Sequence, residues 1–128
     1  MIYLITGSPR SGKTSKAIEM ALALDQSKPV YTNIVDNASD KSYLPKSFKN
    51  IPNEDWTVID EPAFIIYDGC EYISSFCANS KSTSLHVREL LMHRHLGHDI
   101  VFIFQHKKFA HEVIRSCAQH ICLTEIYR

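Results

Sequence analysis

Short apolar runs recur along the chain, separated by polar segments and by stretches of different periodicity. The runs at 1–6, 30–34 and 56–59 predict buried strands, because they are rich in β-branched and aromatic residues and too short for helices. The run at 99–104 (DIVFIF) has no polar residue after its first position and predicts a strand covered on both faces. A last strand is predicted at 121–126.

Three helices are predicted between these strands. The segment 13–24 places its apolar residues at spacings of three and four, which gives it one apolar face. The other helices are predicted at 85–96, where Gly97 would end the helix, and at 109–118. The apolar segment 64–67 fits neither kind of element clearly. Alternating strands and helices are typical of a mostly parallel sheet covered by helices, so the sequence predicts a single three-layer α/β domain over residues 1–128.

Composition and charge fit an ordinary soluble domain. Apolar residues make up 45% and charged residues 22% of the 128 positions, and 14 basic residues balance 14 acidic ones. This balance gives no general electrostatic argument for nucleic acid. The first strand lacks the features of a signal peptide, so we expect a cytoplasmic protein with reduced cysteines. A zinc site at Cys117, His120 and Cys122 stays open, although these residues lack the usual paired ligand spacing.

The strongest motif directly follows the first strand. Residues 7–14 read GSPRSGKT and match the phosphate-binding pattern G-x-x-x-x-G-K-[ST] at every fixed position. Such a loop turns backbone N–H groups toward phosphate, and the helix that follows adds partial positive charge. Lys13 is expected at the β- and γ-phosphates and Thr14 at Mg²⁺, so a nucleotide and Mg²⁺ are the predicted ligands. The residues expected to contact the nucleotide are Gly7, Ser8, Pro9, Arg10, Ser11, Gly12, Lys13, Thr14 and Ser15.

An acidic pair follows the predicted strand at 56–59. In a P-loop domain, an aspartate at the end of a neighbouring strand holds Mg²⁺, and Asp60 takes this position in the predicted arrangement. The next residue, Glu61, would then polarise an attacking water, which is typical of a hydrolase. A purely structural turn is the alternative for this pair.

Two further catalytic candidates come from the second half of the chain. Gln105 follows the strand 99–104, at the sheet edge where open α/β sheets bind ligands, and would orient water or sense the γ-phosphate. The alternative is an ordinary polar residue leaving a strand. Arg94 is preferred to Arg88 and Arg115 as an arginine finger that reaches a neighbouring subunit's phosphate. The histidines at 93–98 are interpreted as a solvated or interface helix end rather than metal ligands, because they lack the i, i+4 spacing.

Four segments together carry a family resemblance. They are the first strand with GSPRSGKT, then YTNI at 31–34, VIDE at 58–61, and RELLMHRHLGHDIVFIFQH at 88–106. On these residues the chain resembles the N-terminal P-loop domain of the zonular occludens toxin family, which includes the gene I assembly proteins of filamentous phages. The resemblance implies ATP and Mg²⁺ binding by Lys13 and Thr14, Walker B roles for Asp60 and Glu61, and a sensor role for Gln105.

The resemblance also implies a cellular role. Members of this family are ATPases related to the FtsK–HerA ring motors and act at the cytoplasmic face of the host inner membrane. A homo-oligomeric ring of this kind would drive the extrusion of phage single-stranded DNA, with assembly-channel proteins as partners. Family members usually continue into a membrane-spanning helix and a periplasmic region, so contact with the membrane is expected only through such a segment.

Two other functions stay open on sequence. A small P-loop kinase for a nucleotide or metabolite would carry several arginines in its lid, whereas the candidate lid at 74–84 has one lysine and no arginine. Glu61 beside Asp60 also favours water over a hydroxyl as the phosphate acceptor. A nucleotide-gated binding module with little turnover cannot be separated from a motor on sequence alone.

Overall fold

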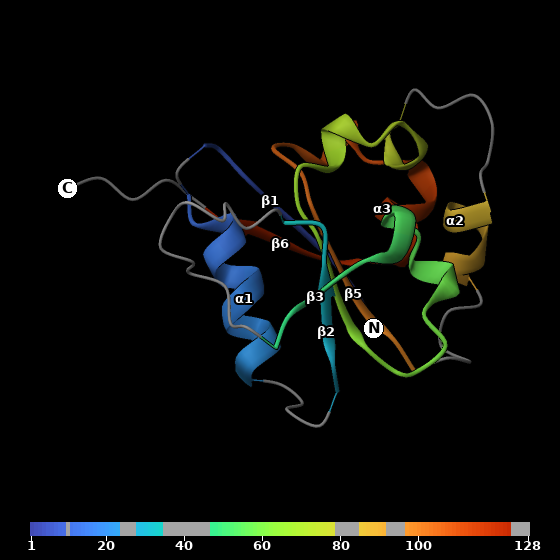
Figure 1. Cartoon of the computed structure of the whole chain (residues 1–128). Helices are drawn as coiled ribbons and strands as arrows, with labels where there is room; N and C mark the ends of the chain where they lie inside the picture. Colours follow the sequence, from blue (N-terminus) through green and yellow to red (C-terminus); the bar gives the residue numbers. More distant parts are fainter. Residues whose placement is uncertain (10, 24–27, 35–46, 79–84, 92–96, 124–128) are drawn as a thin grey trace.

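A computed structural model describes residues 1–9, 11–23, 28–34, 47–78, 85–91 and 97–123. Its strands form one six-stranded sheet in the order β3-β2-β4-β5-β1-β6, and every pairing between them is parallel. The strands are β1 (Ile2–Gly7), β2 (Val30–Thr32), β3 (Lys49–Asn50), β4 (Phe64–Tyr67), β5 (Asp99–Ile103) and β6 (Gln119–Leu123). Figure 1 shows α1 (Lys13–Ala23) on one side of the strands, and α2 (Leu85–Arg88) and α3 (Glu112–Cys117) on the other. The predicted three-layer α/β fold is confirmed.

Both faces of the central strands are buried. On one face the strands pack against α1 through Ala17 and Ala21. On the other they pack against a second layer that contributes Trp56, Leu90 and Ile114. Because β1, β4 and β5 are covered twice, their sequences are continuous apolar runs instead of alternating patterns.

The strand predicted at 56–59 is wrong. Trp56–Val58 form a 3-10 helix, which Asp55 begins by accepting a hydrogen bond from the Thr57 N–H (2.9 Å). Trp56 and Ile59 are 1% and 4% exposed whereas Val58 is 55% exposed, so this apolar segment lies over the sheet as a turn with two buried side chains. The strand of this region is β4, the segment at 64–67 that the sequence left unassigned, and all four of its residues are buried.

The helices and the last strand differ from the predictions mainly at their ends. The first helix is α1, and Leu24 lies outside the described residues. The helix predicted at 85–96 is described to position 91, with α2 followed by the 3-10 turn Glu89–Leu91. The helix predicted at 109–118 is α3, which begins at Glu112. His111 is its N-cap, because the His111 Nδ1 accepts from the Val113 N–H (3.1 Å). Strand β6 begins two residues before the predicted 121–126.

A buried histidine joins the loop before β4 to the start of β5. His98 is 1% exposed; its Nδ1 accepts from the Ala63 N–H (3.2 Å), and its Nε2 lies 3.2 Å from the Ile59 carbonyl. Since a carbonyl oxygen can only accept, Nε2 carries the proton and the ring is neutral. The ring also packs edge-on against Trp56, with centroids 5.9 Å apart. This histidine therefore has a structural place in the fold, unlike the solvated or interface helix end predicted for the histidine-rich segment.

The structure predicts a large cost for His98→Ala. Removing the ring leaves the Ala63 N–H and the Ile59 carbonyl buried without these partners, and it opens a cavity beside Trp56. We expect the free energy of unfolding to fall by about 2–4 kcal/mol. Urea denaturation followed by tryptophan fluorescence measures it. His106→Ala removes an exposed ring that caps a 3-10 turn through Nδ1, and should lower the free energy of unfolding by only about 1 kcal/mol or less. Equal midpoints for the two variants would contradict the structural role.

Asp99 holds charged groups together at the amino edge of the sheet. Its carboxylate accepts from the N-terminal ammonium (3.2 Å) and from Lys28 Nζ (3.0 Å). Lys28 also donates to the Gly97 carbonyl (2.8 Å). These contacts join the starts of three strands and lie away from the loop at 7–14.

No helix among the described residues is long and apolar enough to cross a bilayer.

Candidate nucleotide-binding site

The loop at 7–14 leads from the carboxyl end of β1 into α1, and its backbone requires both glycines of the motif. A Cβ atom on Gly7 would lie 2.5 Å from Ser11 Oγ and 2.7 Å from the Leu123 carbonyl oxygen. Gly12 has a φ of +88°, a conformation that residues with a side chain rarely adopt. Its carbonyl accepts from the Lys16 N–H (2.8 Å), which starts the helix directly after the loop.

The side chains of the loop fit a phosphate group. The Lys13 ammonium lies over the loop and donates to the carbonyls of Gly7 (2.9 Å) and Ser8 (3.0 Å). Ser11 Oγ is buried and has no hydrogen-bond partner among the described residues. A buried hydroxyl without a partner costs free energy, and a phosphate oxygen in the loop would supply that partner. Arg10 lies outside the described residues.

The carboxylate beside the loop belongs to Asp68, not to Asp60. Asp68 directly follows β4, and its Oδ2 accepts from Thr14 Oγ1 at 3.1 Å. Asp60 and Glu61 are exposed and precede β4, and Glu61 accepts from the Tyr31 hydroxyl (3.0 Å). In a parallel sheet, a residue before one strand and a loop after another lie at opposite edges. These positions therefore contradict the predicted metal role of Asp60 and the predicted base role of Glu61.

The side chain of Asn33 holds Asp68 in place. Asn33 Nδ2 donates to the Asp68 carbonyl (2.9 Å), and the Asp68 N–H donates to Asn33 Oδ1 (2.7 Å). The Asp68 carboxylate also accepts from the Gly69 N–H through Oδ1 (2.9 Å), which leaves Oδ2 directed at Thr14. Sequence reasoning gave Asn33 no role, although the YTNI segment that contains it was among the four that carried the family resemblance.

A second carboxylate lies near the same edge. Glu71 Oε2 accepts from the Gln105 N–H (3.1 Å), and the Gln105 carbonyl accepts from the Gly7 N–H (3.3 Å). Gln105 is thus at the predicted edge, next to the start of the loop. Sequence reasoning missed Glu71; the available signal was an acid three positions after an aspartate that ends an apolar run. Burial raises the pKa of the adjacent Cys70 thiol well above its ordinary value, so that thiol stays protonated.

The candidate arginines that the structure describes are not brought to this edge. Arg94 lies outside the described residues, whereas Arg88 and Arg115 lie on α2 and α3, across the sheet from α1. In the described part of the chain, no three histidine, cysteine or acidic side chains form a group that could hold a metal ion. The zinc site left open at Cys117, His120 and Cys122 is therefore not formed.

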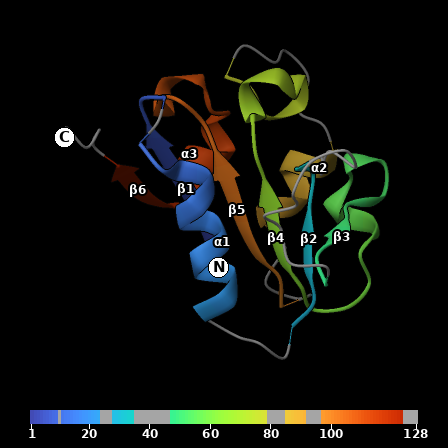
Figure 2. The same cartoon turned by 60° about the vertical axis from the view of Figure 1, so that its left-hand side comes forward.

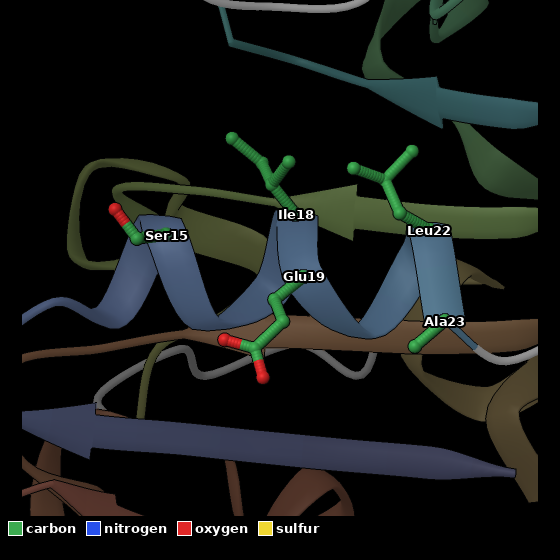
Figure 3. A pocket seen from close by; sticks show the side chains of 5 residues that line it. All are labelled: Ser15, Ile18, Glu19, Leu22 and Ala23. Atoms are coloured by element: carbon green, nitrogen blue, oxygen red, sulfur yellow. The ribbon is translucent and has the colours of Figure 1, made fainter.

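A hollow lies along the outward face of α1 (Figure 3). It is lined by Ser15, Ile18, Glu19, Leu22 and Ala23. Ile18 and Leu22 project to the same side of the helix, so the lining is largely apolar. Neither Lys13 nor Asp68 lines it, so it is distinct from the phosphate-binding loop.

Sequence comparisons identify a family and a relative of this chain. A family model described as zonular occludens toxin (Zot) matches residues 1–124. The assembly protein ORF301 of Pseudomonas phage Pf3 is 37% identical over 120 residues, which cover 91% of this chain and 40% of that protein. The chain therefore spans less than half the length of this relative.

Two solved structures share the fold. The N-terminal domain of zonular occludens toxin from Neisseria meningitidis matches with a TM-score of 0.67 and 24% identity, over 94% of this chain and 75% of that one. B204, the DNA-packaging ATPase from Sulfolobus turreted icosahedral virus, matches with a TM-score of 0.70 and 14% identity, over 99% and 76%.

Proposed function

This chain belongs to the zonular occludens toxin family, and from that premise we propose that it is the ATP-hydrolysing domain of a filamentous-phage assembly motor. The relative from phage Pf3 is an assembly protein, and the fold neighbour B204 is a DNA-packaging ATPase. The observation that carries the proposal is the contact between the Thr14 hydroxyl and the Asp68 carboxylate beside the phosphate-binding loop. P-loop hydrolases place such a hydroxyl and such a carboxylate around Mg²⁺.

In the proposed site, each group has one task. The backbone N–H groups of the loop and the Lys13 ammonium bind the β- and γ-phosphates of ATP. Thr14 and Asp68 would hold Mg²⁺, which when bound neutralises charge on the phosphate oxygens. Asn33 contacts no ligand in this proposal and acts by fixing the backbone of Asp68.

The water that attacks the γ-phosphate needs a base, and Glu71 takes this role in place of Glu61. Its carboxylate lies at the Gln105 N–H, and Gln105 in turn contacts the first glycine of the loop. A carboxylate there can accept a proton from water. The Gln105 side chain would sense the γ-phosphate or orient the water.

The larger assembly is proposed through the family. Copies of the domain would form a ring, in which Arg94 of one subunit reaches the phosphate of the next. The ring would act at the host inner membrane and extrude phage single-stranded DNA with assembly-channel proteins.

An ATP titration with and without Mg²⁺ tests the first step, which is nucleotide binding by the loop. Wild-type protein should bind ATP, and Lys13→Ala should lose binding. Equal affinity of the two proteins would remove the loop from the proposal.

Asn33→Ala is expected to weaken the use of Mg²⁺ because Asp68 loses both hydrogen bonds that fix its backbone. Residues that orient metal ligands typically contribute about 10- to 100-fold in metal affinity or activity. The Mg²⁺ concentration that gives half-maximal ATP hydrolysis should therefore rise by about 10-fold or more. Asn50→Ala, at an exposed asparagine of β3, serves as the control. A merely structural role would lower thermal stability and leave the Mg²⁺ midpoint unchanged.

A further inference from the structure

The segments that follow β4 and β5 form one connected unit at the carboxyl edge of the sheet. The Ala78 N–H donates to the Phe109 carbonyl (2.8 Å), which joins the segment 70–78 to the segment 105–111. Nearer the loop at 7–14, the Glu71 carboxylate accepts a backbone N–H of the second segment (3.1 Å). Figures 1 and 2 show the two segments beside each other at this edge. The unit therefore reaches from the candidate nucleotide site to the outer surface.

Four exposed side chains of this unit, two lysines and two aromatic residues, are together called the loop surface: Tyr72, Lys107, Lys108 and Phe109. Tyr72 is 86% exposed and Phe109 is 42% exposed, and both lysines are exposed. Lys108 Nζ lies 5.4 Å from the centre of the Phe109 ring. A hollow lined by Glu71, Lys108 and Phe109, among others, lies where the two segments meet.

This combination of side chains points to a single-stranded nucleic acid. Lysines contact phosphates, and exposed aromatic rings stack on bases, which present free faces only when they are unpaired. Exposed aromatic rings suit a protein partner as well, but lysine is depleted at protein–protein interfaces, so the two adjacent lysines favour the nucleic acid. The neutral total charge of the chain does not oppose this assignment, because the two lysines are adjacent to each other and to the aromatic ring.

We propose that the loop surface binds single-stranded nucleic acid. The proposal rests on the proposed motor function for its purpose and adds to it the surface that contacts the strand. Glu71 is the candidate base, its carboxylate accepts the Gln105 N–H, and it lines one hollow with Lys108 and Phe109. The loop surface is therefore connected directly to the proposed site of ATP hydrolysis.

Fluorescence anisotropy of a labelled oligothymidylate, titrated with the whole chain at several salt concentrations, tests the proposal. Replacing both lysines, Lys107→Ala with Lys108→Ala, should weaken binding and lower the slope of log K against log salt by about 1.4, since each phosphate contact on a single strand contributes about 0.7. Tyr72→Ala should weaken binding by about fivefold or more if its ring stacks on a base. ATP affinity, measured on the same preparations, should stay at the wild-type value and shows that the variants are folded.

Lys49→Ala is the matched control, because Lys49 Nζ also lies 5.4 Å from the centre of an aromatic ring, that of Tyr31, but belongs to β3. It should not change oligonucleotide affinity. The proposal for the loop surface is overturned if the chain binds ATP but no oligonucleotide, or if the double lysine substitution leaves oligonucleotide affinity unchanged. In either case the proposed function stands. Tighter binding to duplex than to single strands would also overturn it. If the chain binds no ATP and the surface variants still lose the oligonucleotide, the proposed function fails and the surface stands.

Discussion

Asp68→Asn is expected to lower Mg²⁺-dependent ATP hydrolysis by at least about 100-fold, because a bound metal ion supplies several kcal/mol of transition-state stabilisation. In the structure, the Asp68 carboxylate is the acid that contacts the Thr14 hydroxyl beside the loop (3.1 Å). Asparagine preserves the size and the backbone contacts with Asn33, so the loss should arise from the missing charge. Steady-state phosphate release at saturating ATP, measured across Mg²⁺ concentrations, gives the effect.

Asp60→Asn is the matched control for this substitution. Both are aspartates near β4, but Asp60 is exposed and precedes the strand. It should hydrolyse ATP at nearly the wild-type rate. An inactive Asp60→Asn together with an active Asp68→Asn would contradict Asp68 as the metal ligand and would assign that role to Asp60.

Glu71→Gln is expected to keep ATP binding and to lower hydrolysis by about 100-fold or more, the contribution typical of a general base. The carbamoyl oxygen of glutamine can still accept the Gln105 N–H that Glu71 accepts in the structure. The substitution thus removes the ability to take a proton while it retains the contact between the two segments. ATP titration and phosphate release on the same protein separate binding from chemistry.

Glu61→Gln provides the corresponding control, because Glu61 is exposed and accepts from the Tyr31 hydroxyl at the amino side of β4. It should retain both binding and turnover. Turnover of Glu71→Gln within a fewfold of wild type would remove Glu71 from the mechanism.

The parts of the fold that could be predicted are those that local sequence determines strongly. The loop at 7–14 needs glycine at two positions for steric and conformational reasons, so its residues identify it without tertiary information. Strand β5 is buried on both faces and therefore appears as an uninterrupted apolar run. The segments 56–59 and 64–67 are both short and apolar. The Asp55 cap at Thr57 and the packing of Trp56 over the sheet distinguish the 3-10 turn from the strand.

The error at the acidic pair follows from that choice of strand. A strand at 56–59 makes Asp60 and Glu61 the acids at its end, whereas the strand at 64–67 makes Asp68 the acid. The role of Asn33 depends on contacts with a residue 35 positions away, which no local pattern encodes. Gln105 could be placed correctly because it directly follows a strand whose position was predicted.

Phosphate release from Mg²⁺-ATP by the purified chain, with no acceptor added, tests the central proposal most directly. It should be measured over a wide range of protein concentration, with Lys13→Ala as the blank. A hydrolytic motor domain predicts release that depends on Lys13, and specific activity that climbs with concentration as neighbouring subunits complete each other's sites. Bound ATP without release at any concentration, together with phosphate transfer once a hydroxyl acceptor is supplied, would contradict the motor and identify a kinase.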